Sequence, residues 1–164
     1  MKHPEYYMQS HAEQCHAGTA PTLYALNETY GAAFRIWLVD LVAYIALMSG
    51  TRDKLTAQQE VFVQKLFLDK GYIKISELLL FVSRYIAGDY GQTFGYIDPQ
   101  RIGVAFGTFL GERREAITKI ENAQRQRERD KQAKGITFEE YRRIMAEHGV
   151  DVPPLTLDGI TKKI

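Results

Sequence analysis

Apolar residues recur at intervals of three and four along most of this chain, and that spacing is typical of amphipathic helices. The segment 56–71 shows the pattern most clearly. Thr56 and Gln59 match a capping box, in which each side chain bonds the backbone amide of the other residue. Apolar residues follow at helical spacing from Val61, and Gly71 predicts a left-handed end to this helix.

Three more helices are predicted from the residue types that begin and end helices. Serine, threonine and aspartate accept hydrogen bonds from the first free amides, proline fits the first helical position, and glycine fits the end. The helices are 76–88, from Ser76 to Gly88; a long helix that begins at Asp98 and Pro99; and 138–148, from the Thr137–Glu140 capping box to Gly149. Few stretches alternate apolar and polar residues as a half-buried strand does.

Residues 32–48 are almost uniformly apolar, and only Arg35 and Asp40 are charged. A membrane-spanning helix needs about 20 apolar residues, and an aspartate in its middle is costly. The segment therefore predicts a central core helix that is buried on most sides. We expect Trp37 to lie in the core on this helix.

The long helix that begins at Pro99 changes character along its length. Its apolar face continues to about residue 123, whereas 124–135 offers only Ala133 as an apolar side chain. A helix without an apolar face cannot pack on a core, so this stretch either projects into solvent or frays.

These elements, with weaker helices at 5–17 and 22–30, predict an all-α fold. We expect residues 1–123 to form a compact bundle of about five to six helices. Residues 124–164 then form a projecting charged helical arm, a short amphipathic helix and a C-terminal tail.

The composition is that of an ordinary globular domain, with 164 residues, 45% of them apolar and 25% charged. Cys15 is the single cysteine, which excludes an intrachain disulfide and fits a reducing compartment. The first residues, Met1 to Tyr6, contain no apolar run of the kind that a secretory signal needs. We therefore expect a cytoplasmic protein with no membrane segment.

Candidate catalytic and metal-binding residues are few. His3, His11, Cys15 and His16 lie close together in sequence and include the ligand types that zinc prefers, but a second ligand pair is missing. Cys15 and His16 are adjacent, which places them on different parts of a helix, and His148 stands near a helix end. We expect scattered histidines, no metal, no cofactor and no enzymatic activity.

The loop between the predicted helix 76–88 and the long helix that begins at Asp98 is rich in glycine and aromatic residues. Gly88, Gly91 and Gly95 follow a helix rather than a strand, and their spacing matches no phosphate-binding loop. They predict a helix end and turns, with aromatic side chains that fold the loop back onto the domain. The alternative is a platform on which bases stack, although residues 50–98 carry no net charge.

The strongest binding feature is a concentration of positive charge, because residues 99–145 carry eleven basic and seven acidic residues. The candidate contact residues for nucleic acid or a partner are Arg113, Arg114, Lys119, Arg125, Arg127, Arg129, Lys131 and Lys134. Stacked cations on a helix become favourable when phosphates displace their counterions. Two alternatives remain open: a solvated helix that Glu128 and Asp130 largely neutralise, and a protein-binding helix.

The block from Tyr72 to Arg114 resembles small helical proteins encoded in phages and mobile elements of Bacteroidetes-type gut bacteria. In that group a helix leads into a Gly-Asp-Tyr-Gly turn and a second helix that ends in a Glu-Arg pair. The matching residues are Lys74, Leu79, Phe81, Arg84, Gly88, Asp89, Tyr90, Gly91, Gly95, Ile97, Asp98, Glu112 and Arg113. The resemblance implies a mobile-element setting in a bacterial host and brings no catalytic residues.

We therefore expect a non-enzymatic accessory protein of a phage or mobile element that contacts nucleic acid or a replication assembly through a basic helix. The alternative is a protein-interaction module, such as a virion component or an oligomeric scaffold, that does not bind nucleic acid. Dependence on salt separates the two, because phosphate binding weakens steeply with salt and an apolar interface does not.

Overall fold

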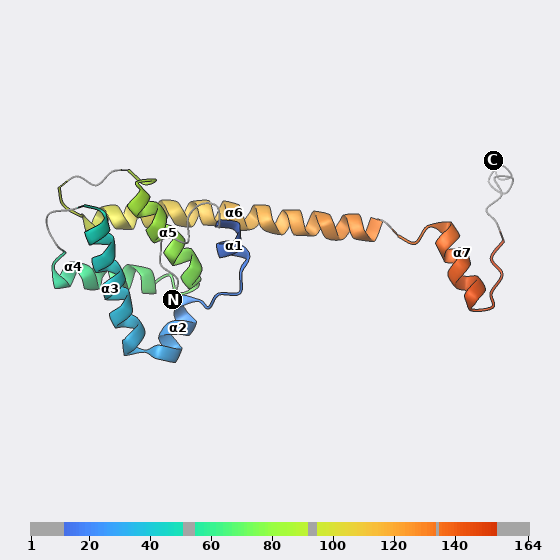
Figure 1. The fold of residues 1–164 in the computed structure, drawn as a ribbon, viewed down its shortest axis with the longest axis horizontal. Coiled ribbons are helices and arrows are strands. Elements are labelled where there is room, and N and C mark those ends of the chain that lie inside the picture. The colour runs from blue at the N-terminus through green and yellow to red at the C-terminus, as the bar shows by residue number, and fades with distance from the viewer. Residues whose placement is uncertain (1–11, 51–54, 92–94, 134, 154–164) are drawn as a thin grey trace. The chain divides into compact units, whose positions relative to one another are not determined.

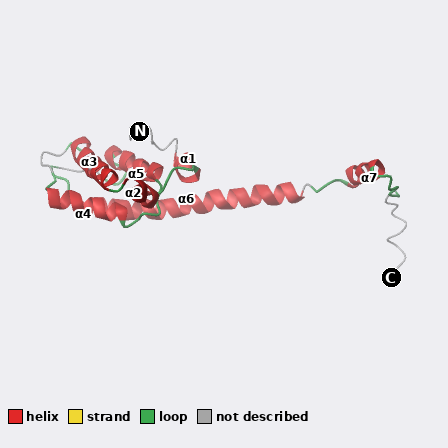
Figure 2. Cartoon of the chain, turned by 90° about the horizontal axis from the view of Figure 1, so that it is seen from below, coloured by secondary structure: helices red, strands yellow, loops and turns green. Residues whose placement is uncertain are grey.

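A computed structural model gives the fold of the chain (Figure 1), and the structure describes residues 12–50, 55–91, 95–133 and 135–153. Within those ranges the secondary structure consists of seven helices and includes no strand (Figure 2). The predicted all-α fold class is confirmed. None of the helices in these ranges combines the length and the apolar character that a membrane span needs.

The chain divides into two compact units, Met1–Glu121 and Asn122–Ile164. The helices are α1 (Ala12–Ala17), α2 (Leu23–Tyr30), α3 (Ala32–Met48), α4 (Ala57–Leu68), α5 (Ile75–Ala87), α6 (Pro99–Ala133) and α7 (Phe138–Glu147). The first five belong to the first unit and α7 belongs to the second. Helix α6 begins in the first unit and ends in the second.

The predicted helix starts with local caps are confirmed at three places. Thr56 and Gln59 exchange both bonds of a capping box, at 2.8 and 3.3 Å. Thr137 and Glu140 do the same at the start of α7, at 3.1 and 3.2 Å. The Asp98 carboxylate accepts a hydrogen bond of 2.8 Å from an amide in the first turn of α6.

The predicted helix ends are right in two cases and wrong in one. Gly88 and Gly149 both have positive φ, 89° and 77°, and end α5 and α7 as predicted. Gly71 does not, because α4 has already ended before it. Its lack of a side chain instead permits a close approach of α2, since a Cβ there would lie 3.2 Å from the Cβ of Tyr24.

The prediction that Ser76 caps α5 is also wrong. The N-cap is Lys74, whose amide donates to the Glu77 carboxylate at 2.8 Å. Ser76 is buried one residue inside the helix, and its hydroxyl donates to the carbonyl oxygen of Cys15 at 3.0 Å. A tertiary contact with α1 therefore uses the hydroxyl that the local pattern assigns to capping.

The core of the first unit is aromatic where α4, α5 and the first part of α6 meet. The ring of Phe106 lies 5.0 Å from those of both Phe67 and Phe81, edge-on in each case. Phe109 packs against Phe81 one turn further along α6, with the centroids 5.6 Å apart. All four rings are essentially buried, so they fix α6 against the other two helices.

Helix α3 has the predicted bounds but not the predicted burial. Leu38 and Ile45 face the core and are fully buried, whereas Ile36 and Leu47 are 64% and 74% exposed. The apolar run therefore covers both a core face and an outer face, and the helix is not buried on most sides. Trp37 is half-buried at the edge of the core rather than inside it.

The loop after α5 folds back onto the first unit only in part as predicted, because Tyr96, one of the aromatic residues expected to do this, is 64% exposed. Tyr90 packs against the core and Ile97 is buried at its edge. Gly91 and Gly95 both have positive φ, 96° and 78°, which a turn requires there. Phe94 lies outside the described residues.

Candidate functional site

The basic residues after Glu121 lie on the final turns of α6, in the second unit. This stretch is helical up to Ala133, and every side chain from Asn122 to Lys131 is exposed. The cations that it carries are Arg125, Arg127, Arg129 and Lys131. Because Ala123 is the only apolar residue between 122 and 131, packing on a core cannot account for the choice of residues.

These four cations form two pairs on opposite sides of the helix. Successive residues of an α-helix are rotated by about 100°, so residues four apart lie within about 40° of each other. Arg125 and Arg129 therefore share one side, and Arg127 and Lys131 share another. The centres of the two pairs lie about 160° apart around the axis by the same geometry.

Within residues 125–131 the acidic and amide side chains lie between the two pairs. Gln126 and Asp130 occupy one intervening face, where the Gln126 amide nitrogen donates to the Asp130 carboxylate at 2.9 Å. Glu128 occupies the other face. The helix is therefore neither uniformly basic nor neutral, because its positive charge is concentrated in two stripes.

The remaining predicted contact residues have different surroundings. Arg114 and Lys119 are exposed on the part of α6 that belongs to the first unit. Lys134 lies outside the described residues. Arg113 does not belong with the exposed cations, because it is half-buried and its Nε donates to the fully buried carboxylate of Glu77 at 2.9 Å. Its inclusion in the predicted contact surface is therefore corrected.

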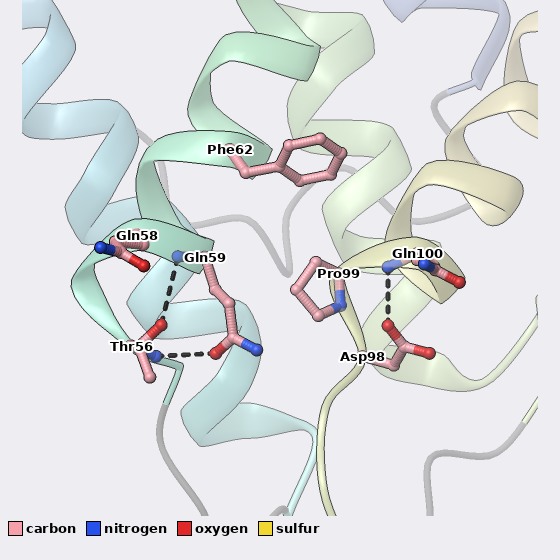
Figure 3. Close-up of a pocket in the computed structure, with 7 residues that line it drawn as sticks. All are labelled: Thr56, Gln58, Gln59, Phe62, Asp98, Pro99 and Gln100. Atoms are coloured by element: carbon pink, nitrogen blue, oxygen red, sulfur yellow. Dashed lines mark hydrogen bonds between the residues drawn. The ribbon is translucent and has the colours of Figure 1, made fainter.

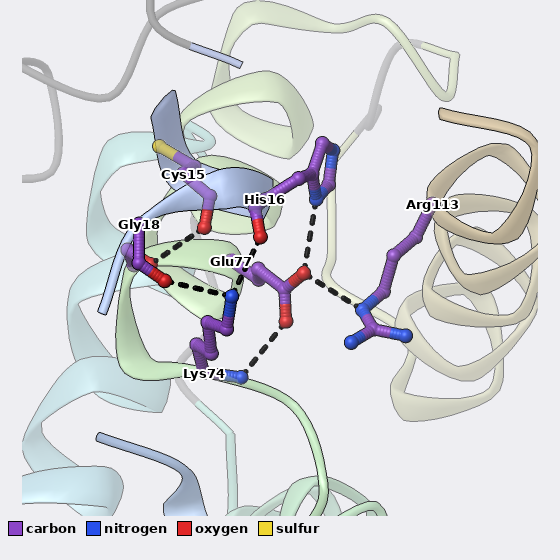
Figure 4. Close-up of polar contacts among 7 residues, drawn as sticks. Cys15, His16, Gly18, Lys74, Glu77 and Arg113 are labelled. Atoms are coloured by element: carbon purple, nitrogen blue, oxygen red, sulfur yellow. Dashed lines mark hydrogen bonds and ion pairs between the residues drawn. The ribbon is translucent and has the colours of Figure 1, made fainter. Parts of the chain in front are cut away.

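Glu77 is the centre of a buried polar cluster that joins three helices (Figure 4). Besides Arg113, it contacts His16 Nδ1 at 3.0 Å and accepts from the Lys74 amide at 2.8 Å. Arg113 also lies over the ring of Tyr72. Burial by itself raises the pKa of Glu77, but the hydrogen bonds from His16, Lys74 and Arg113 outweigh it and lower the pKa below its ordinary value of 4.5.

The same cluster binds carbonyl groups at the end of α1 and in the turn that follows it. The Lys74 Nζ donates to the carbonyl oxygens of His16 and Gly18, at 2.6 and 2.8 Å, and Ser76 donates to that of Cys15. A helix end leaves such carbonyls unsatisfied unless side chains reach them. Burial, with the neighbouring carboxylate, raises the pKa of the Cys15 thiol to about 11. The cluster thus holds α1 in place and keeps its thiol neutral.

The placement of His16 bears on the histidines near the start of the chain. His3 and His11 lie outside the described residues, and the described ones contain no group of three or more His, Cys, Asp or Glu side chains that could hold a metal ion. The sequence predicts a scattered histidine at position 16. Instead, His16 is buried against Glu77.

A second polar cluster lies beside an open groove on the first unit. Arg84 bonds both Asp89, at 3.0 Å, and Glu112, at 2.7 Å, and its guanidinium lies over the ring of Tyr90. Burial raises the pKa of the Tyr90 hydroxyl well above its ordinary value, and the Glu112 carboxylate adds to the shift, so Tyr90 is neutral. The contacts connect the loop after α5 to α6.

Another open groove separates the first turns of α4 and α6 (Figure 3). Phe62 and Pro99 form its apolar part, while Thr56, Gln59 and Asp98 make the cap bonds described above. These polar groups satisfy the ends of their own helices, so the groove is an outcome of helix capping.

The short helix α7 is amphipathic and has no buried residue. Phe138, Tyr141, Ile144 and Met145 share one side of it by helical spacing, and the first two rings lie 6.5 Å apart. Tyr141 and Ile144 are 43% and 38% exposed. The described part of the second unit therefore does not cover this apolar face.

Sequence reasoning missed the Glu77 cluster but could have found one sign of it. Glu77 stands among leucines and a phenylalanine in a helix that is otherwise apolar on that side. An acidic residue at such a position needs a partner of opposite charge. The partners, His16 and Arg113, lie 61 and 36 residues away, and no local pattern identifies them.

A comparison with protein families finds a match over the second half of the first unit and beyond it. The model of a family described as a family of unknown function (DUF6633) matches residues 54–148. The matched segment begins just before α4 and ends at the residue that caps α7, so it includes the basic part of α6. No curated protein and no solved structure matches the chain.

Proposed function

The chain belongs to this family of unknown function (DUF6633), and we propose that it is a non-enzymatic accessory protein that contacts nucleic acid through α6. The contact is made by residues 125–131, which we call the basic segment. The resemblance over 72–114 supports the setting, a phage or mobile element in the cytoplasm of a bacterial host, where the protein would act on nucleic acid or within a replication assembly.

The observation that carries the proposal is the exposure of four cations within seven residues of a continuous helix. Long cationic side chains on such a helix can reach phosphate oxygens without any change in the fold. The segment offers no apolar surface of its own to a protein partner. Phosphate is therefore the ligand chemistry that its side chains fit best.

The test replaces all four cations by glutamine and measures binding of the full chain to DNA and RNA at low ionic strength. Glutamine keeps the helix propensity, so circular dichroism should be unchanged while retention is lost. For the wild type, log affinity should fall with log salt by about 0.7–0.9 per neutralised phosphate. Absence of salt-sensitive binding to either nucleic acid would refute the proposal.

The uncovered face of α7 favours a second candidate function, a scaffold component assembled from copies of this chain. A second copy can supply the apolar surface that the described part of the unit lacks, by pairing its own α7 against the first. This candidate needs no nucleic acid and uses a different helix.

Light scattering across a range of protein concentrations tests the scaffold. An oligomer that Ile144→Glu converts to monomer, while the matched change Glu147→Gln on the polar face leaves it intact, would support this function. A wild-type chain that is monomeric at high concentration would exclude it.

A further inference from the structure

The two basic pairs flank one polar face of the helix in a nearly symmetrical way. If Gln126 marks the centre of that face, Arg125 and Arg129 lie about 60–100° to one side of it by helical geometry. Arg127 and Lys131 lie about 100–140° to the other side. Measured from the midpoint between Gln126 and Asp130, each pair lies about 80–120° away, so both pairs lie on the flanks of the helix with this amide and carboxylate between them.

The shape of a phosphate-bearing ligand determines whether it can contact one basic pair or both. A flat or single-stranded backbone lies along one side of a helix and meets one pair, while the other pair faces away. A groove with phosphates on both walls meets both pairs at once. The major groove of B-form DNA is about 12 Å wide, which matches the width of about 10–12 Å of a helix with its side chains.

We propose that the basic segment lies in the major groove of duplex DNA, with each basic pair against the phosphates of one strand and Gln126 towards the bases. The inference rests on the proposed function, which requires only that some nucleic acid is bound. Duplex RNA is excluded as the main ligand, because its major groove is deep and too narrow for side chains to read.

The acidic residues are placed compatibly with this orientation. Glu128 lies on the face opposite Gln126 and so points away from the groove. Asp130 lies beside Gln126 and bonds its amide, which places the carboxylate towards the base edges rather than towards the flanks. Carboxylates and amides are both groups that can contact base edges in the major groove.

The test compares two variants that each remove one pair, Arg125→Gln with Arg129→Gln, and Arg127→Gln with Lys131→Gln. Their control is Lys65→Gln with Arg143→Gln, which removes two exposed cations outside the segment. Affinity for a duplex DNA, a duplex RNA and a single strand is measured against salt concentration. For duplex DNA each pair variant should reduce the slope of log affinity against log salt by about 1.8, and the control should not.

Protection of guanine N7 from methylation tests the position of the helix in the groove, because N7 is exposed in the major groove. The wild type should protect N7 in the bound duplex, and both pair variants should lose that protection. If the slope changes for only one of the pair variants, or if single strands bind as tightly as duplex DNA, the proposed position in the major groove is wrong. Nucleic-acid binding itself would still stand. Absence of binding to all three would instead refute the proposed function.

Discussion

Replacing Glu77 by glutamine should destabilise the first unit far more than any exposed charge change. The side chain is fully buried, and the Arg113 side chain that it pairs with is only 16% exposed. Glutamine preserves the size and one acceptor oxygen but removes the negative charge. Arg113 is then left without its counter-charge in a position that water reaches poorly.

The magnitude follows from the cost of breaking a buried ion pair by removing one partner, about 3–5 kcal/mol. For a protein of this length, each kcal/mol lowers the melting temperature by about 2–4 °C, so the expected decrease is about 6–20 °C. Oε1 of Glu77 contacts His16 and Arg113, and Oε2 accepts from the Lys74 amide, so glutamine with its single oxygen also loses the bonds made at one of these two positions, which acts in the same direction. Helix α1 should detach first, because Glu77 and its neighbours hold it.

Urea unfolding monitored by circular dichroism measures the effect, with Glu115→Gln as the exposed control, expected to change stability by less than about 0.5 kcal/mol. Because the folded pKa of Glu77 is lowered, its stabilisation is complete above its ordinary pKa of 4.5 and is lost as the pH falls through the folded value. The difference between wild type and Glu77→Gln should therefore be constant from neutral pH to about pH 5 and then shrink. Equal stability of the two at neutral pH, or a difference that persists unchanged in acid, would refute the reasoning.

Two further predictions concern single residues of the first unit. Asp98→Ala should lower the free energy of unfolding by about 0.5–2 kcal/mol, because the first turn of α6 loses its cap, and a melting curve identical to that of the wild type would contradict this. The Cys15 thiol, with its pKa raised to about 11, should react slowly with iodoacetamide at pH 8.5 in the folded protein and quickly in urea, and rapid labelling of the folded chain would show that α1 is not docked.

The sequence by itself determined the features that depend on neighbouring residues. The capping boxes at Thr56 and Thr137 and the cap at Asp98 were predictable because both partners of each bond lie within one turn. The exposure of residues 124–131 was predictable for a similar reason, since a stretch without an apolar side cannot be buried.

Only the tertiary structure decided which polar residues take part in folding and which face solvent. Arg113 and Arg114 are adjacent and chemically identical, yet the first pairs with Glu77 and the second is exposed. Ser76 is a residue type that favours helix caps, but its hydroxyl instead donates a hydrogen bond to α1. In each case the partner lies on another helix. The distance between the two side chains depends on how the helices pack, and the spacing of residues along the sequence does not encode that packing.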